Sequence, residues 1–83
     1  MDEIKVIRAK IDTVDEQIMA LLEKRFALAS QMGGFKKSEN IAITHKTRED
    51  AILLKANAFS HCSQIQAVYQ EIFQQSKLIQ EEV

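Results

Sequence analysis

The chain has 83 residues, one cysteine and a formal net charge of −1. This length predicts a single domain over residues 1–83, and so short a domain usually needs a disulfide, a metal or a partner chain for stability. The lone Cys62 excludes an intrachain disulfide, and its spacing from His61 and His45 is not that of a zinc site. We therefore expect oligomerisation, and no metal.

Charge and hydropathy exclude several further classes. A net charge near zero gives no indication of binding to nucleic acid or to an anionic membrane surface. We expect neither a secretory signal nor a membrane span, because no apolar stretch has the required length and flanks. The single thiol fits a reducing, cytoplasmic setting. With no proline, two glycines and 46% hydrophobic residues, the composition favours an all-α bundle.

The first predicted helix runs from about Asp2 to about Lys37 and carries apolar residues at heptad spacing. This helix is roughly 50 Å long, and the two remaining helices together could only just cover it. We therefore expect its apolar seam to pack against a second copy of the chain. The a positions are Ile4, Ile11, Ile18, Arg25 and Met32, and the d positions are Ile7, Val14, Leu21, Leu28 and Phe35.

Two shorter helices are predicted to follow. Residues 38–46 are predicted to form a loop, and the second helix is expected to end near Asn57. A connector over residues 58–63 then leads to the third helix, which ends near Glu82. The N-cap candidates are Thr47 for the second helix and Ser60 or Ser63 for the third.

Several polar residues lie at or beside positions where the heptad pattern predicts apolar ones. Arg25 occupies an a position, where an unpaired guanidinium is costly to bury. On pattern alone, a register-setting role with an acid such as Glu23 or Asp15 is favoured over an anionic ligand. Arg8 and Lys36 flank the same seam at e positions, where exposed ion pairs are the simpler explanation.

The two shorter helices carry three more such residues. Arg48 lies in the first turn of the second helix, where the helix dipole disfavours a cation, although a structural ion pair would explain it. Ser76 interrupts the apolar stripe of the third helix, as a small residue does where helices pack closely. Gln80 lies one turn later on the same side, and exposure near the C-terminus accounts for it equally well.

Arg8 and Arg25 are seventeen residues apart, which is roughly 25 Å along one helix. No small ligand bridges that distance within one chain. Antiparallel packing of two copies would bring Arg8 of one chain near the middle of the other. We hypothesise that a pocket built from both chains then holds several cations around one small anion.

Three segments together resemble the AroQ-type, all-helical chorismate mutases over nearly the whole chain. The first is IRAKIDTVDEQIMALLEKRFALASQMGGFKK, the second TREDAIL and the third IFQQSKLIQ. They are similar to the family in their Ile-Asp and hydrophobic-Asp pairs, Leu-Leu-x-x-Arg, Gly-x-x-Lys, Arg-Glu and Ser-x-x-x-Gln. The resemblance implies an intertwined homodimer with one long and two shorter helices per chain. It also implies conversion of chorismate to prephenate in phenylalanine and tyrosine biosynthesis, without a cofactor.

The implied reaction is a pericyclic rearrangement, which needs no nucleophile and no acid–base pair. Catalysis would consist of positioning and electrostatic stabilisation. By the resemblance, Arg25 and Arg8 of the partner subunit would bind the two carboxylates of the substrate. Lys36 would reach a carboxylate and the ether oxygen, and Gln80 would donate to that same oxygen. Because a glutamine needs no protonation, activity should persist at neutral pH.

The resemblance also implies supporting roles and contains departures. Glu49 would accept a hydrogen bond from the ring hydroxyl, while Arg48 and Ser76 would support the carboxylate contacts. His45 stands where the family usually has Asp, which could alter the preferred ring substituent. The connector before the third helix looks shorter than in the family, which could shift Ser76 and Gln80.

Alternatives of two classes stay open. Isochorismate pyruvate lyase and aminodeoxychorismate mutase share the fold, although Glu49 and Ser76 favour the mutase over the lyase. A non-catalytic helical dimer that binds a protein would use the same heptads. A mutase that depends on a partner enzyme of the shikimate pathway is the remaining alternative.

Overall fold

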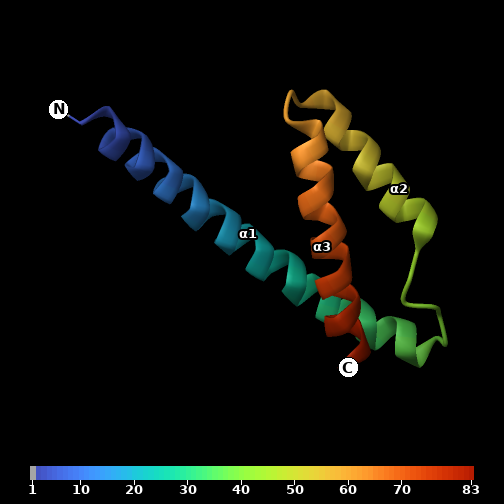
Figure 1. The fold of residues 1–83 in the computed structure, drawn as a ribbon. Coiled ribbons are helices and arrows are strands. Elements are labelled where there is room, and N and C mark those ends of the chain that lie inside the picture. The colour runs from blue at the N-terminus through green and yellow to red at the C-terminus, as the bar shows by residue number, and fades with distance from the viewer. Residues whose placement is uncertain (1) are drawn as a thin grey trace.

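The computed structural model describes residues 2–83, which form three α-helices (Figure 1). Helix α1 spans Glu3–Ser38, α2 spans Lys46–Lys55 and α3 spans Cys62–Glu81. A 3-10 turn, Ala56–Ala58, extends α2 toward α3. The predicted all-α fold, with one long and two shorter helices, is confirmed. Within the described residues, no helix has the length and apolar character needed to cross a membrane.

Both ends of α1 are closed by local hydrogen bonds. The Asp2 side chain accepts a hydrogen bond from the backbone N–H of Ile4 at 2.9 Å, so the predicted N-cap is confirmed. At the other end the backbone N–H of Ile41 donates to the Lys36 carbonyl at 2.8 Å. This 6→1 bond closes around Asn40, whose φ of 56° lies in the left-handed region that asparagine tolerates.

The predicted N-caps of the two shorter helices are wrong. Helix α2 begins at Lys46, with His45 as its N-cap, so Thr47 lies inside the helix. The imidazole Nδ1 of His45 accepts from the backbone N–H of Arg48 at 3.1 Å, which is the role usually given to a Ser, Thr or Asp oxygen. Helix α3 follows His61 without a side-chain cap, so neither Ser60 nor Ser63 has that role.

The second helix also ends earlier than predicted. Its α-helical part stops at Lys55, and Asn57 lies in the tighter 3-10 turn that follows. On the exposed side of α2, Lys46 and Asp50 form an i,i+4 ion pair at 2.8 Å. The hydrogen bond and charge of Asp50 raise the pKa of Lys46. Because both side chains are largely exposed, the pair contributes little to stability.

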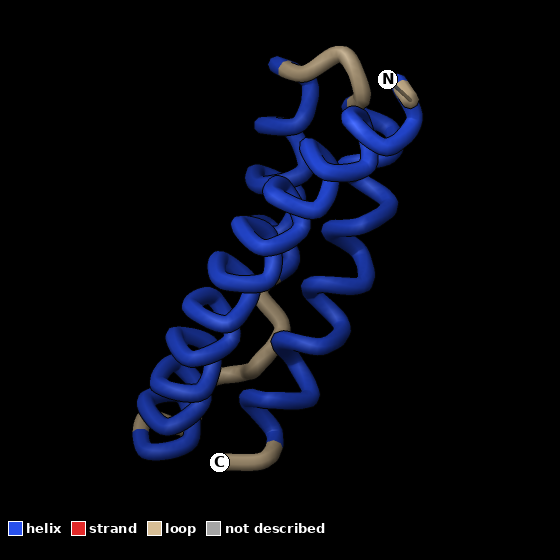
Figure 2. Tube along the Cα trace, turned by 90° about the vertical axis from the view of Figure 1, so that its left-hand side faces the viewer, coloured by secondary structure: helices blue, strands red, loops and turns tan. Residues whose placement is uncertain are grey.

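Helices α2 and α3 form a hairpin, and α3 is the helix of this hairpin that packs on the C-terminal half of α1 (Figures 1 and 2). The buried apolar residues are few: Ala29 from α1, Ala56 from the 3-10 turn and Phe73 from α3. The N-terminal half of α1 extends away from this packed region (Figure 1). One end of the molecule therefore holds the core, and the other is a single bare helix.

The bare half of α1 gives the chain an extended shape. Its radius of gyration is 16.1 Å, whereas a compact domain of this length has about 12 Å. Its accessible surface of 6807 Å² exceeds the value for a folded monomer of this mass by about 1,800 Å². For two chains that excess is roughly 3,600 Å², which is typical of obligate dimers. The shape is consistent with the predicted intertwined dimer.

The heptad seam lies on the surface of the single chain. Every residue from 3 to 21 is exposed, including the apolar a and d positions of that stretch. Such a long row of exposed aliphatic side chains is unusual for a monomer in water. The exposed seam residues are Ile4, Ile7, Ile11, Val14, Ile18, Leu21, Leu28, Met32 and Phe35.

Helix α3 lies very close to α1 at Gly33. A Cβ atom added to Gly33 would lie 2.8 Å from both the Cα and the carbonyl oxygen of Gln80. Only glycine fits at that distance, because the neighbouring atoms belong to the backbone. The adjacent Gly34 has room, since its added Cβ would meet Val83 Cγ1 at 3.6 Å.

We expect Gly33→Ala to destabilise the protein by about 1–3 kcal/mol, because the two backbones must separate. Gly34→Ala is the matched control and should be neutral or stabilising by up to about 1 kcal/mol, since alanine favours the helix. Urea unfolding at one fixed protein concentration measures both. Equal effects of the two substitutions would contradict the close approach.

Candidate active site

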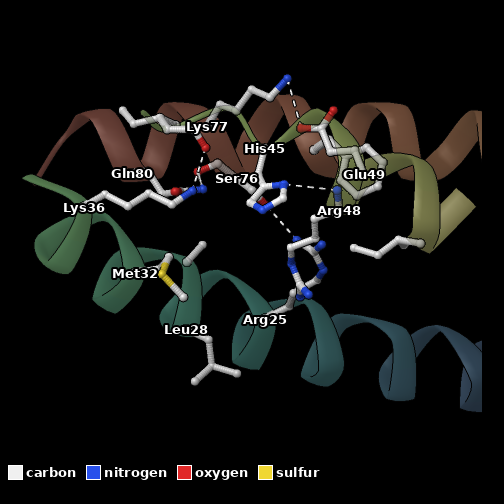
Figure 3. Close-up of a pocket in the computed structure, with 14 residues that line it drawn as sticks. Arg25, Leu28, Met32, Lys36, His45, Arg48, Glu49, Ser76, Lys77 and Gln80 are labelled. Carbon is white, nitrogen blue, oxygen red and sulfur yellow. Dashed lines mark hydrogen bonds and ion pairs between the residues drawn. The ribbon is translucent and has the colours of Figure 1, made fainter. Parts of the chain in front are cut away.

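A pocket of about 290 Å³ lies between the C-terminal half of α1, the start of α2 with the loop before it, and the C-terminal half of α3 (Figure 3). This volume is at the lower end of the range for small-molecule sites. Six of the seven predicted site residues line it: Arg25, Lys36, Arg48, Glu49, Ser76 and Gln80.

Arg8 is the predicted site residue that the fold of one chain does not bring to the pocket. It lies in the bare half of α1, roughly 25 Å along the helix from Arg25, and is exposed to solvent. A straight helix cannot fold back on itself, so Arg8 reaches such a pocket only in another chain.

Arg25 is held without an acidic partner. Its Nη1 donates to Ser76 Oγ at 2.7 Å, and its guanidinium carbon lies 5.9 Å from the ring centre of Tyr69 and 5.7 Å from that of Phe73. These distances suit cation–π attraction. Among residues 2–83 no carboxylate lies within ion-pair distance of Arg25, so the expected pairing with Glu23 or Asp15 is wrong. The positive charge is left for an anion in the pocket.

Lys36 anchors the loop that precedes α2. Its Nζ donates to the Ile43 carbonyl at 2.6 Å. An ammonium carries three N–H donors, so two are left for other acceptors. The contact therefore fixes where the ammonium lies without using all of its hydrogen-bonding capacity.

Gln80 lies with Lys36 at one end of the pocket, and Arg25 lies toward the other (Figure 3). Its Nε2 donates to the Ser76 carbonyl at 3.3 Å, which is a long hydrogen bond. Its Oε1 is buried and has no hydrogen-bond partner within the described residues. An unsatisfied buried acceptor costs about 1–3 kcal/mol. This end of the pocket is therefore suited to binding a polar group.

The first turn of α2 forms the third side of the pocket. Arg48 is exposed there, and the neighbouring Glu49 pairs with Lys77 of α3, with 3.2 Å between Oε2 and Nζ. His45 lines the pocket as well while it caps the helix. The free N–H groups of a helix N-terminus add partial positive charge at this place.

Charge in the pocket is predominantly positive. Its lining contains four cationic side chains and one carboxylate, and aliphatic side chains such as Leu28, Met32 and Ile52 fill the space between them. A partly enclosed, cationic pocket attracts anions. Within the described residues no group of three or more His, Cys, Asp or Glu side chains could hold a metal ion. The arrangement is suited to binding and polarising a small anionic molecule.

Lys77 is a pocket residue that the sequence interpretation missed. The Ser-x-x-x-Gln pattern treats its position as variable. A helical signal was nevertheless present, because Lys77 lies four residues after Phe73 and so shares its side of α3. On the side of α3 that carries the apolar stripe, Lys77 therefore places a cation in the pocket.

The chain is similar to known proteins in both sequence and fold. The family model described as chorismate mutase type II matches residues 7–81, a range that includes all seven predicted site residues. The bifunctional chorismate mutase/prephenate dehydratase of Aquifex aeolicus is 34% identical over 79 residues. That match covers 95% of this chain and 20% of the relative, so the chain spans about a fifth of the relative's length.

A solved structure is similar over nearly the whole fold. It is a conserved hypothetical protein from Pyrococcus furiosus, with a TM-score of 0.83 and 32% sequence identity. The match covers 96% of this chain and 97% of that one. The long α1 and the α2–α3 hairpin are therefore an arrangement that another solved chain shares.

The His45 cap gives a stability prediction. We expect His45→Ala to destabilise the protein by about 1 kcal/mol, because the N–H of Arg48 loses its acceptor. His45→Asp restores a good N-cap acceptor and should be close to the original protein. Thermal unfolding at matched concentration compares the three proteins. An equal loss in both variants would contradict a capping role.

Proposed function

Since the chain belongs to the chorismate mutase type II family, we propose that it converts chorismate to prephenate. The observation that carries this proposal is the pocket, where four cations and four further hydrogen-bonding side chains surround a space of about 290 Å³. Chorismate is a compact dicarboxylate and suits such a space. The product would serve phenylalanine and tyrosine biosynthesis. The dehydratase named for the Aquifex relative is not proposed, because the chain spans about a fifth of that protein.

The reaction is an intramolecular rearrangement in which an ether C–O bond breaks as a C–C bond forms. No atom leaves and no proton is transferred, so the protein must hold the reactive, folded conformer and stabilise charge. Arg25 would bind one carboxylate. Its guanidinium has further N–H donors beyond the one that Ser76 accepts, and the Tyr69 and Phe73 rings restrict its position.

Lys36 and Gln80 would act on the ether oxygen, where negative charge builds as the C–O bond breaks. Lys36 keeps two N–H donors after its contact with Ile43. The long bond from Gln80 Nε2 to the Ser76 carbonyl is weak enough to exchange for one to the substrate. Donors placed before the reaction need no reorganisation during it. Since the amide does not titrate, activity should persist at neutral pH.

The first turn of α2 and the C-terminal half of α3 would complete the contacts to substrate. Glu49 would accept from the ring hydroxyl, and its place in the lining supports this role. Arg48 would add positive charge near a carboxylate. Ser76 would act through Arg25, whose Nη1 it holds at 2.7 Å.

We further propose that the working unit is a homodimer in which Arg8 of each chain enters the pocket of the other. The exposed seam of α1 supports this, because a second antiparallel copy would cover it. Arg8 of the partner subunit would then bind the second carboxylate. Two desolvated guanidinium groups fix both the charge and the orientation of a dicarboxylate.

The test is product analysis after incubation with chorismate and, separately, with isochorismate. We expect prephenate from chorismate at a rate far above the uncatalysed one. Lys36→Ala should lower kcat by a factor of at least about 100, because it removes a charge needed mainly in the transition state. The matched control Lys37→Ala, on the exposed side of the same turn, should change kcat less than about twofold.

Circular dichroism and sedimentation should show the Lys36→Ala variant folded and in the same oligomeric state. Pyruvate and salicylate from isochorismate as the dominant products would contradict the mutase and identify a lyase. No turnover of either substrate would contradict an enzyme that acts alone.

A further inference from the structure

The Lys77–Glu49 ion pair joins two helices at one edge of the pocket. Lys77 comes from α3 and Glu49 from the first turn of α2, and both side chains line the pocket (Figure 3). Nothing in the sequence motifs assigns a role to Lys77. An ion pair inside a ligand pocket neutralises part of the pocket's positive charge. A role for Lys77 within the pocket would explain why the pair lies there.

This pair differs from an ordinary surface ion pair. Its side chains are 28% and 17% exposed, whereas those of the Lys46–Asp50 pair are 75% and 54% exposed. Partial burial reduces screening by salt and by water, so the geometry of the Lys77–Glu49 pair is better defined. Within the lining of this pocket, Glu49 is also the one carboxylate.

The contact uses one oxygen of the carboxylate. Lys77 Nζ lies 3.2 Å from Oε2, and within the described residues Oε1 takes part in no hydrogen bond that the structure shows. A carboxylate accepts at both oxygens. Lys77 thus fixes the direction of the Glu49 side chain and leaves one oxygen to accept from a donor in the pocket.

The pair also joins the pocket end of α2 to α3. The other polar contact between the two helical segments, from Gln66 Nε2 to the Leu53 carbonyl at 3.0 Å, lies near the opposite end of α2. Between these points the helices have little direct contact. Lys77 therefore restrains the first turn of α2, which carries both Glu49 and Arg48.

We propose that Lys77 is a positioning residue that orients Glu49 for a hydroxyl donor of the bound anion. The proposal rests on the proposed function and adds a specificity determinant to it. Through Oε2, Lys77 holds the carboxylate, so that Oε1 selects ligands with an O–H group beside their anionic groups. An anion without such a donor would leave Oε1 unpaired and bind less well.

The alternative role for Lys77 is direct contact with a ligand carboxylate. The two roles differ in their dependence on Glu49. If Lys77 only positions Glu49, replacing Lys77 has no effect on kcat/KM once Glu49 has lost its charge. If Lys77 contacts the ligand directly, replacing it lowers kcat/KM whether or not Glu49 is charged. A double-mutant cycle separates them.

The experiment measures kcat and KM for chorismate in the original protein and in Lys77→Met, Lys77→Arg, Glu49→Gln and the Lys77→Met/Glu49→Gln double variant. We expect Lys77→Met to lower kcat/KM on the order of tenfold, as coupled charged neighbours do. Lys77→Arg should restore most of the loss. In the Glu49→Gln background, Lys77→Met should change kcat/KM less than about twofold.

Lys46→Met is the matched control, because it removes the other ion pair of α2 outside the pocket. It should leave kcat/KM unchanged. Lys77→Leu also removes both the charge and the N–H donors, and it replaces Lys77→Met if that variant does not fold. Circular dichroism verifies the fold of each variant.

Two results would overturn the inference. One is a kcat/KM unchanged by Lys77→Met, and the other is a loss of the same size with and without Glu49. If the original protein converts chorismate and either result appears, this inference fails and the proposed function stands. If the original protein does not convert chorismate, the proposed function fails, and this inference fails with it.

Discussion

The backbone contact between Gly33 and Gln80 determines how the pocket is built. Helix α3 lies so close to α1 there that no side chain fits between them. This contact places Gln80 beside Lys36, three residues further along α1, and leaves Ser76 one turn earlier to meet Arg25. The helices are rigid, so one close approach sets the distances between four polar side chains. The pocket thus depends on a glycine that carries no chemistry.

A second constraint comes from the half of α1 that touches nothing within its own chain. Its exposed aliphatic seam cannot be stable in water without a cover, and the excess surface of the chain is of the size that a dimer buries. The same half carries Arg8. We thus propose that dimer formation both buries the seam and brings Arg8 to the cations of the pocket. The stability of the chain and the binding of a dianion would then both require the second copy.

Most of the helices could be predicted from the sequence, because heptad spacing and the absence of proline determine them. Six of the seven candidate residues line one pocket, and their roles in it stay predictions. The N-caps of the two shorter helices could not be predicted, because N-cap acceptors are usually Ser, Thr, Asp or Asn oxygens and His45 uses an imidazole nitrogen. The partners of Arg25 and the pairing of Lys77 with Glu49 depend on how α3 lies against α1 and α2, which periodicity within one helix does not encode.

The central claim, a site shared between two chains, is tested most directly by mixing two defective proteins. Arg8→Ala and Arg25→Ala should each be nearly inactive toward chorismate. After joint unfolding and refolding at equal concentration, half of the dimers pair the two variants, and each of these has one intact site of two. We expect recovery of about a quarter of the original activity. No recovery above the separate proteins, with mixed dimers shown by mass spectrometry, would contradict the shared site.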